Sequence, residues 1–226
     1  MDGSGTTDPT DTVKRKILLE EYTGHQCPNC PSAAVIAHEL EDLYPGQITI
    51  VAVHAGVFSM MVSPNYLVDY TCTEGNELNS FFGVSAVGNP NGTVNRKEYS
   101  GSPIVGPSDW GSKIAEFLLM DPDADINVIR TFNEGTGAID LTVNVDFFSE
   151  ITNDIMVCAY LTEDSIVSYQ KNNDPAVGTT PEISDYTHMH VLRGSMNGTW
   201  GDTLVTGGVV ANDFATKDIK YTISTV

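Results

Sequence analysis

The 226-residue sequence predicts an α/β unit over residues 13–122 and an all-β, antiparallel, sandwich-like unit over residues 123–226. The length exceeds the roughly 100 to 150 residues usual for one domain. Short apolar runs alternate with amphipathic helical patterns in the first half. After a Pro-containing break at residues 121–123, apolar and polar residues alternate and turn signals separate the runs. This change of pattern indicates two units of different class.

Residues 1–12 (MDGSGTTDPTDT) are small, polar and acidic, and they offer nothing to bury. This composition predicts a flexible tether outside the fold. A chain that begins just after a removed export signal has this character, and so does an ordinary disordered tail or an expression scar.

A β-α-β unit is predicted near the start of the first domain. Residues 13–22 contain the apolar run Ile17-Leu18-Leu19 and end in Glu20-Glu21-Tyr22, which indicates a buried strand. Residues 31–44 place apolar side chains on one helical face, and residues 47–54 are rich in β-branched residues. The crossover in such a unit pairs its strands in parallel. Cys27 and Cys30 therefore lie at the N-terminus of the predicted helix.

The remaining elements are predicted from periodicity and turn residues. In chain order they are an insertion (55–73), a helix (74–82), a strand (93–99), a helix (108–118), strands (126–132, 137–148, 154–162), a polar loop (164–185) and final strands (187–195, 203–210, 218–226). The last strand has no closing turn, so we expect a sandwich that lacks its final strand and leaves an edge open.

The composition excludes two classes of partner. Lys and Arg number 11 against 30 Asp and Glu, which gives a net charge of -19. Such a chain repels phosphate backbones and anionic headgroups, so we expect no nucleic-acid partner. No apolar run approaches the roughly 18 residues that span a bilayer.

The motif Cys27-Pro28-Asn29-Cys30 predicts thiol chemistry. A helix N-terminus supplies unpaired N–H groups and a partial positive charge, which favour the thiolate. We expect Cys27 to be the more exposed sulfur and to attack, Cys30 to resolve the mixed disulfide, and Pro28 and Asn29 to tune the potential, without an added cofactor. A permanent disulfide without turnover is the alternative.

The other cysteines and histidines predict no metal site. We expect Cys158 to be a buried free thiol, and Cys72 lies in the insertion. His188 and His190 are expected on one strand face, where two ligands alone are inadequate for a metal and a polar patch is the preferred interpretation. His54 is expected to be a hydrogen-bonded structural residue.

Residues 18–22 (LLEEY), followed after four residues by the Cys-x-x-Cys motif, resemble the active-site segment of thioredoxins. The resemblance implies that Glu21 lies buried near the resolving cysteine and handles its proton. It also implies that Pro90 follows a cis bond and, with Asn89, binds an extended substrate, although a plain type I turn also fits. His25 is expected to stabilise the thiolate as a cation or to cap the loop.

Three motifs together resemble the Omp-twenty-eight-related family of outer-membrane lipoproteins of Bacteroidetes: residues 23–31 (TGHQCPNCP), 53–56 (VHAG) and 186–193 (YTHMHVLR). This resemblance implies a thioredoxin-like domain followed by a sandwich-like one. It also implies location in the cell envelope at the outer membrane, and a lipid anchor on a cysteine that precedes this chain.

Two functions follow from these observations. The first is thiol-disulfide exchange with the thiols or disulfides of other exported proteins. The second is a cell-surface binding or structural lipoprotein that uses the thioredoxin fold as a scaffold without redox turnover. A homodimer formed through residues 123–226 is a further expectation, since edge strands offer free N–H and C=O groups.

Overall fold

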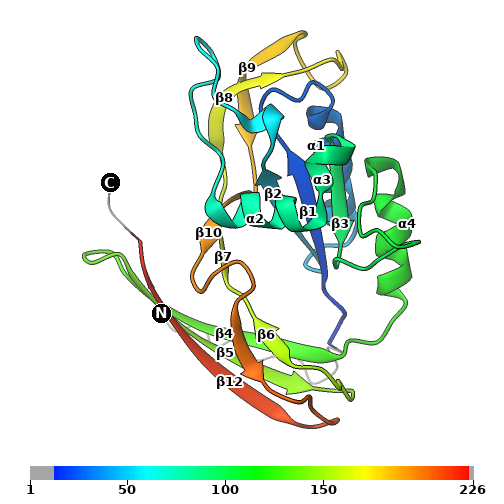
Figure 1. The fold of residues 1–226 in the computed structure, drawn as a ribbon, viewed down its shortest axis with the longest axis vertical. Helices are drawn as coiled ribbons and strands as arrows, with labels where there is room; N and C mark the ends of the chain where they lie inside the picture. The colour runs from blue at the N-terminus through cyan, green and yellow to red at the C-terminus, as the bar shows by residue number, and fades with distance from the viewer. Residues whose placement is uncertain (1–12, 224–226) are drawn as a thin grey trace.

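The structure, a computed structural model, describes residues 13–223 and has a mixed α/β fold in which strands outnumber helices. The predicted tether over residues 1–12 lies outside the described part. An α/β layer occupies the upper half of the molecule, and a curved sheet lies below it (Figure 1). Every element from residue 124 to residue 222 is a strand.

The elements of the first half are β1 (Ile17–Thr23), α1 (Cys30–Leu43), β2 (Ile48–His54), a short 3-10 helix (Val57–Ser59), α2 (Thr73–Phe82), α3 (Val84–Val87), β3 (Asn91–Val94) and α4 (Pro107–Leu118). Those of the second half are β4 (Ala124–Asn133), β5 (Ala138–Phe147), β6 (Ile155–Val157), β7 (Tyr160–Glu163), β8 (Ile166–Lys171), β9 (Glu182–His188), β10 (Val191–Ser195), β11 (Asp202–Val205) and β12 (Phe214–Thr222).

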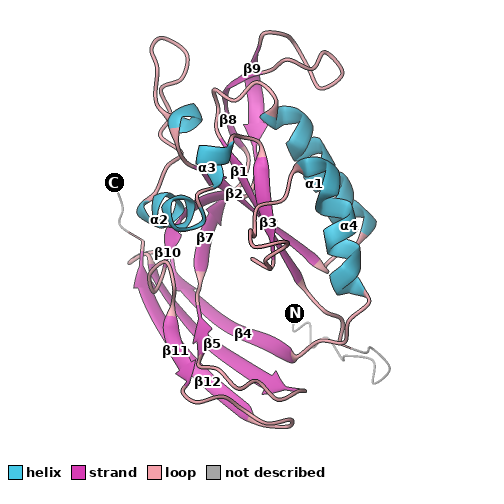
Figure 2. Ribbon diagram, turned by 45° about the vertical axis from the view of Figure 1, so that its right-hand side comes forward, coloured by secondary structure: helices cyan, strands magenta, loops and turns pink. Residues whose placement is uncertain are grey.

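The predicted β-α-β unit is confirmed, with β1 and β2 paired in parallel along their whole lengths. β3 pairs with the other side of β1 and runs antiparallel to it. Helices α1 and α4 cover one face of this sheet, and α2 and α3 cover the other (Figure 2). Because helices cover both faces of the sheet, its strands present mainly apolar side chains on both faces. The main buried residues are Ile17, Leu19, Ile48, Ile50, Trp110 and Ile114 on the first face, and Tyr22, Val51, Val53, Leu78 and Leu192 on the second.

The second half of the chain contributes to this sheet, whose full order is β3-β1-β2-β10-β7. β10 meets β2 where Val191 pairs with Ala52, and the Ala52 N–H donates to the His190 carbonyl at 2.8 Å. Val191 and Leu192 are fully buried. The predicted boundary at residue 122 therefore does not separate the sheets, because apolar residues far beyond it complete the first core.

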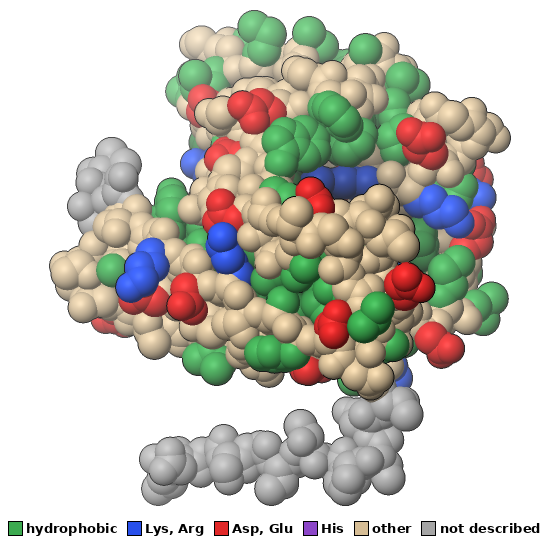
Figure 3. All heavy atoms as spheres, turned by 60° about the horizontal axis from the view of Figure 1, so that its bottom comes forward, with side chains coloured by type: hydrophobic (Ala, Val, Ile, Leu, Met, Phe, Trp, Pro, Cys, Tyr) green, Lys and Arg blue, Asp and Glu red, His purple; other side chains and the backbone are tan. Residues whose placement is uncertain are grey.

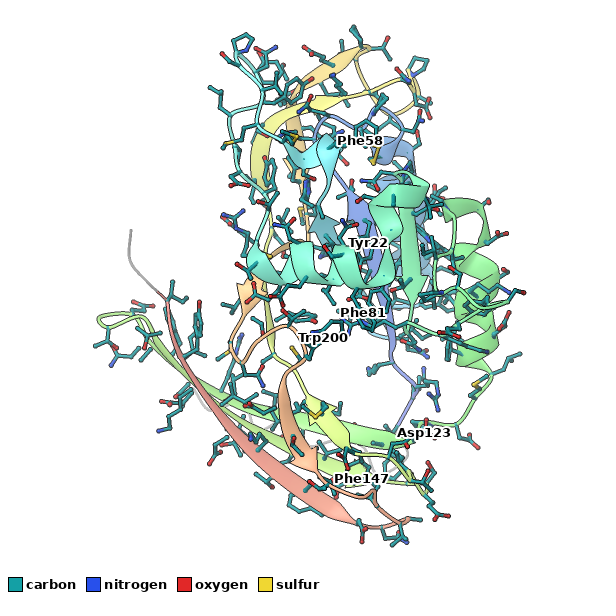
Figure 4. The ribbon with its side chains drawn as sticks, viewed as in Figure 1. Tyr22, Phe58, Phe81, Asp123, Phe147 and Trp200 are labelled. Carbon is teal, nitrogen blue, oxygen red and sulfur yellow. A yellow bond between two sulfur atoms is a disulfide. The ribbon has the colours of Figure 1, made fainter. Side chains whose placement is uncertain are left out.

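The lower sheet has the order β12-β5-β4 and packs against the two-stranded β11-β6 sheet. Phe147 lies between these layers (Figure 4), with Val143 and Val145 buried beside it. The last described strand, β12, is an edge strand, as expected. β4 is the other edge. Hydrophobic side chains lie exposed among charged ones when the molecule is viewed from below (Figure 3).

Four predicted elements are wrong. The strands predicted over 154–162 and 187–195 are each interrupted, at residues 158–159 and 189–190, and their two parts lie in different sheets. The predicted loop over 164–185 contains β8 and the start of β9, which form an antiparallel hairpin. The predicted strand over 93–99 ends at Val94, because Asn95 and Arg96 adopt left-handed backbone angles (φ 49° and 53°) that a strand does not allow.

A buried ion pair within the first half of the chain is hydrogen-bonded to the second half. The Glu20 carboxylate is fully buried and accepts from Arg96 Nε (2.9 Å), Arg96 Nη2 (2.6 Å) and Thr93 Oγ1 (2.8 Å). Arg96 Nη2 also donates to the Tyr160 hydroxyl at 3.0 Å, and that hydroxyl donates to the Thr199 carbonyl at 2.7 Å. Arg96 therefore satisfies a buried carboxylate and links it to β7.

We expect Arg96→Met to lower the free energy of unfolding by about 3 kcal/mol or more, because it leaves the Glu20 carboxylate buried without its cation. The measurement is urea unfolding at pH 7. Lys220→Met is the matched control: Lys220 and its partner Asp140 have 81% and 54% side-chain exposure, so this change costs less than about 1 kcal/mol. Equal losses in the two variants would contradict the prediction.

Candidate functional site

The loop between β1 and α1 carries a disulfide between Cys27 and Cys30, whose Cα atoms lie 5.4 Å apart. This distance is within the usual disulfide range, as predicted. α1 begins at Cys30, one residue before the predicted start, so the pair lies at the N-terminus of the helix as expected. Pro31 occupies the first turn of the helix, where its missing N–H costs nothing. The Cys27 N–H donates to the Gly24 carbonyl at 2.9 Å, which closes the loop into a turn.

Both cysteines are buried, with exposed fractions of 0% for Cys27 and 2% for Cys30. The prediction that Cys27 is the more exposed sulfur is therefore wrong. The physical reason is that two segments distant in sequence lie over the loop, one from the β8–β9 hairpin and one from residues 56–66.

The β8–β9 hairpin is fixed to the cysteine loop by hydrogen bonds. The buried Gln170 side chain donates from Nε2 to the carbonyls of Cys27 (2.9 Å) and Gly24 (3.3 Å). Further bonds run from Lys171 N to His25 O (2.8 Å), from Asn173 N to Pro28 O (2.9 Å) and from Ser32 Oγ to Asp174 Oδ2 (2.9 Å). Sequence reasoning missed Gln170 because it took 164–185 as a loop, although the alternation in residues 166–170 (IVSYQ) is a strand signal.

The second cover comes from the segment after β2. The Gln26 N–H donates to the Phe58 carbonyl at 2.9 Å, and His25 Nε2 lies 2.9 Å from the Met60 carbonyl. Phe58 lies at the upper end of the α/β layer (Figure 4). A Cβ atom at Gly24 would lie 2.5 Å from the backbone of Phe58, so only glycine permits this approach.

Burial lowers the pKa of His25, which keeps its imidazole neutral at pH 7. A neutral ring bonded to a backbone carbonyl favours the second of its two predicted roles, that of a loop cap. Since Cys27 is disulfide-bonded and covered, the other role as a thiolate partner stays a prediction.

Glu21 lies on β1 and lines a cavity of about 30 Å³ together with Cys30, His54 and His188. This volume holds one or two water molecules. The Glu21 side chain is buried, and its Oε1 atom has no hydrogen-bond partner among the described residues. Burial raises the pKa of Glu21 to about 8. The site therefore holds a protonated carboxyl group beside Cys30 at neutral pH.

Tyr70 packs against two histidines that line this cavity, His54 and His188. The ring centroid of Tyr70 lies 4.7 Å from that of His54 and 4.5 Å from that of His188. Burial lowers the pKa of His188 to about 4 and that of His54 well below its usual value, and the proximity of the histidines adds to the effect. His54 is buried, as a structural residue would be, but its Nδ1 has no hydrogen-bond partner among residues 13–223.

Asn89 and Pro90 precede β3, and the bond between them is cis, as predicted. Asn89 Nδ2 donates to the Thr23 carbonyl at 3.2 Å, which ties this segment to the end of β1. The placement of Pro90 beside the Cys27 sulfur stays a prediction.

The sequence also singled out two further cysteines and a pair of histidines. Cys72 and Cys158 are free and half-buried, and Cys72 Sγ caps α2 by accepting from the Gly75 N–H. His188 and His190 do not share a strand face, because β9 ends at His188 and His190 has a left-handed φ of 55°.

A groove of about 640 Å³ lies between β2 and β7. Its lining includes Ile48 and Val51 from β2, Tyr160 from β7, and the polar side chains of Glu41 and His190. Grooves of this size hold small molecules or side chains of a partner.

The family model for outer membrane protein Omp28 matches residues 76–226, and the chain belongs to this family. Membership confirms the predicted location at the outer membrane of the cell envelope. No curated protein matches the sequence. Among the described residues, no helix has the length and apolar character needed to cross a membrane.

Two solved structures are similar in fold. The first is HBP35 of Porphyromonas gingivalis, with a TM-score of 0.60 and 17% identity over 94% of this chain and 65% of that one. This chain thus spans 65% of the length of HBP35. The second is a crystal structure of a protein from Agrobacterium tumefaciens, with a TM-score of 0.53 and 14% identity over 93% of this chain and 80% of that one.

We expect Glu21→Gln to stabilise the protein at alkaline pH. The folded-state pKa of about 8 lies above the usual 4.5, so the folded protein holds a proton that the unfolded chain releases, and stability falls as pH rises through this window. Above pH 8 the ionised group costs on the order of 5 kcal/mol of folding stability. Urea unfolding without reductant should show variant and wild type alike near pH 4.5 and the variant more stable at pH 8.5.

The control for this prediction is Glu98→Gln, which removes an exposed carboxyl group. It should follow the wild-type pH dependence. Parallel curves for wild type and Glu21→Gln would show that Glu21 ionises normally in the folded protein.

Proposed function

We propose that this Omp28-family protein is an envelope binding or structural protein in which the Cys27–Cys30 disulfide is a sealed cross-link. The burial of both cysteines carries this proposal. Exchange requires a thiolate to reach a disulfide sulfur, and the covering hairpin blocks this approach. The scaffold function, which was the alternative from the sequence, therefore fits the geometry better than turnover does.

The proposal assigns a thioredoxin-like fold to the first part of the chain and a sandwich-like fold to the second. The order β1, cysteine pair, α1, parallel β2, Pro90 and antiparallel β3 supports the first assignment. The packing of β12-β5-β4 on β11-β6 supports the second. A lipid anchor on a preceding cysteine, implied by the sequence resemblance, completes the proposal for an outer-membrane lipoprotein.

The groove between β2 and β7 is the proposed place of binding. Its volume of about 640 Å³ lies within the range of about 300 to 1,000 Å³ typical of ligand sites. An apolar wall from β2 faces a few polar groups, which is the usual composition of such sites.

Glu21 supports exchange as a second candidate function. A buried carboxyl group with a pKa of about 8 beside Cys30 is suited to move the proton of a resolving thiol at neutral pH. Turnover on exported protein thiols would then require the β8–β9 hairpin to lift from the cysteine loop.

Redox titration of the oxidised protein separates the two functions. We expect a reduction potential below about −300 mV and no insulin reduction above background, as for a structural disulfide. A potential between about −270 and −120 mV together with insulin turnover would establish exchange instead.

Gln170→Ala tests directly whether the β8–β9 hairpin limits the access of a reductant to the disulfide. It removes the side-chain bonds to the Cys27 and Gly24 carbonyls, so dithiothreitol should reduce the disulfide faster than in the wild type, as followed by mass-tagged alkylation. Gln47→Ala is the control, since its side chain donates to the Arg15 carbonyl. Equal rates in the two variants would show that the hairpin does not limit access.

Self-association through the lower sheet is the proposed partner contact. On edge strand β4, Ile126 and Val128 pair with the buried Val145 and Val143 and so share the core face, yet they are 62% and 49% exposed. A second copy would cover this strip. We expect light scattering to show a dimer that Val128→Lys disrupts. Ile129→Lys, on the opposite face of β4, should leave it intact, and a wild type that is monomeric at about 100 μM would contradict the proposal.

A further inference from the structure

We propose that His38, Glu41 and His190 form a binding site for a zinc-class divalent cation, with a fourth coordination position open to the groove. Among the described residues, their ligand atoms all lie within 4.8 Å of one another. His38 and Glu41 are three positions apart on α1 and share a helical face. His190 comes from the short connection between β9 and β10, so the site joins segments about 150 residues apart in sequence.

The separations fit one tetrahedral ion. Glu41 Oε2 lies 3.8 Å from His38 Nδ1 and 3.6 Å from His190 Nε2. Zinc binds nitrogen and oxygen at about 2.0 to 2.1 Å, so ligand atoms at two corners of the tetrahedron lie about 3.4 Å apart. Octahedral corners lie about 3.0 Å apart, which requires a larger contraction. The His38 and His190 ligand atoms lie within 4.8 Å of each other, so side-chain rotations that draw them together by up to about 1.4 Å bring all three atoms onto one ion.

Asp164 supplies the outer support that metal-binding histidines need. Its Oδ1 lies 3.4 Å from His190 Nδ1 and accepts the His190 backbone N–H at 2.6 Å. This directs the other ring nitrogen, Nε2, at Glu41. A histidine held by a carboxylate at one nitrogen and by metal at the other is a recurring arrangement in zinc proteins. The left-handed backbone of His190 (φ 55°) is what places both of its nitrogens between acidic groups.

The donor set selects the chemical class of the ion. Two imidazoles and one carboxylate suit zinc and neighbouring transition metals, whereas calcium and magnesium require oxygen ligands. The side chains of His38, Glu41 and His190 are 42%, 32% and 21% exposed, so an ion reaches them from solvent. Glu41 and His190 also line the groove between β2 and β7, so a water or ligand atom in the fourth position faces it.

The test is titration of the oxidised, tag-free protein with Zn²⁺ by calorimetry and with Co²⁺ by absorption, because tetrahedral Co²⁺ has a strong visible spectrum. We expect one ion per chain and a tetrahedral Co²⁺ spectrum. His38→Ala, Glu41→Gln and His190→Ala should each abolish both signals. Asp164→Asn should weaken binding roughly 10- to 100-fold, as loss of an outer carboxylate does.

Glu39→Gln is the matched control, since it removes an exposed carboxylate from the same helix without touching the site. It should bind Zn²⁺ like the wild type. His38 and Glu41 lie on the helix surface, so their variants keep the fold even where His190→Ala does not. The proposal is overturned if the wild type binds no Zn²⁺, or if the His38 and Glu41 variants bind as tightly as Glu39→Gln.

Discussion

The backbone groups of the cysteine loop need hydrogen-bond partners, and the rest of the structure is arranged to supply them. The loop is irregular and buried, so its carbonyls have no partners within a helix or strand. The Gln170 side chain and the backbone N–H groups of Lys171 and Asn173 provide these partners from the end of β8 and the residues just after it. Because the hairpin continues into β10, which pairs with β2, the same segment that covers the disulfide also extends the sheet. The β8–β9 hairpin, which covers the disulfide, and β10, which extends the sheet, are therefore one continuous segment of the chain.

Burial in this part of the structure shifts the pKa values of four titratable side chains. Glu21 is kept protonated, whereas His25, His54 and His188 are kept neutral, all through burial. The lowered histidine pKa values mean that stability falls as pH drops below about 6.5, because the unfolded chain then binds protons that the folded protein excludes. The raised pKa of Glu21 has the opposite effect, because its contribution to stability falls as the pH rises toward 8. The combined contribution of these four groups to the stability of the protein is therefore greatest near neutral pH.

The local pattern of the sequence predicted the β-α-β unit, the helix that begins at Cys30 and the edge position of β12. It did not predict the cover, because that depends on contacts between residues about 140 positions apart. Cys27 was expected to be the more exposed sulfur because a helix N-terminus alone leaves it accessible, but the β8–β9 hairpin and residues 56–66 lie over the loop and bury it. His190 was assigned to a strand from alternation, but its left-handed backbone turns it away from His188 and toward α1.

The position of His190 connects the proposed metal site to the disulfide. It lies between β9 of the cover and β10 of the sheet, while its partners His38 and Glu41 lie on the helix that begins at Cys30. An ion bound by all three fixes the end of the hairpin to that helix. Lifting the hairpin from the cysteine loop would then strain or break a metal ligand, so metal binding and opening oppose each other. By linkage, any partner that opens the cover weakens metal affinity by the same factor by which the metal resists opening. An ion in the proposed site would therefore oppose the opening that exposes Cys27 and Cys30, although it touches neither sulfur.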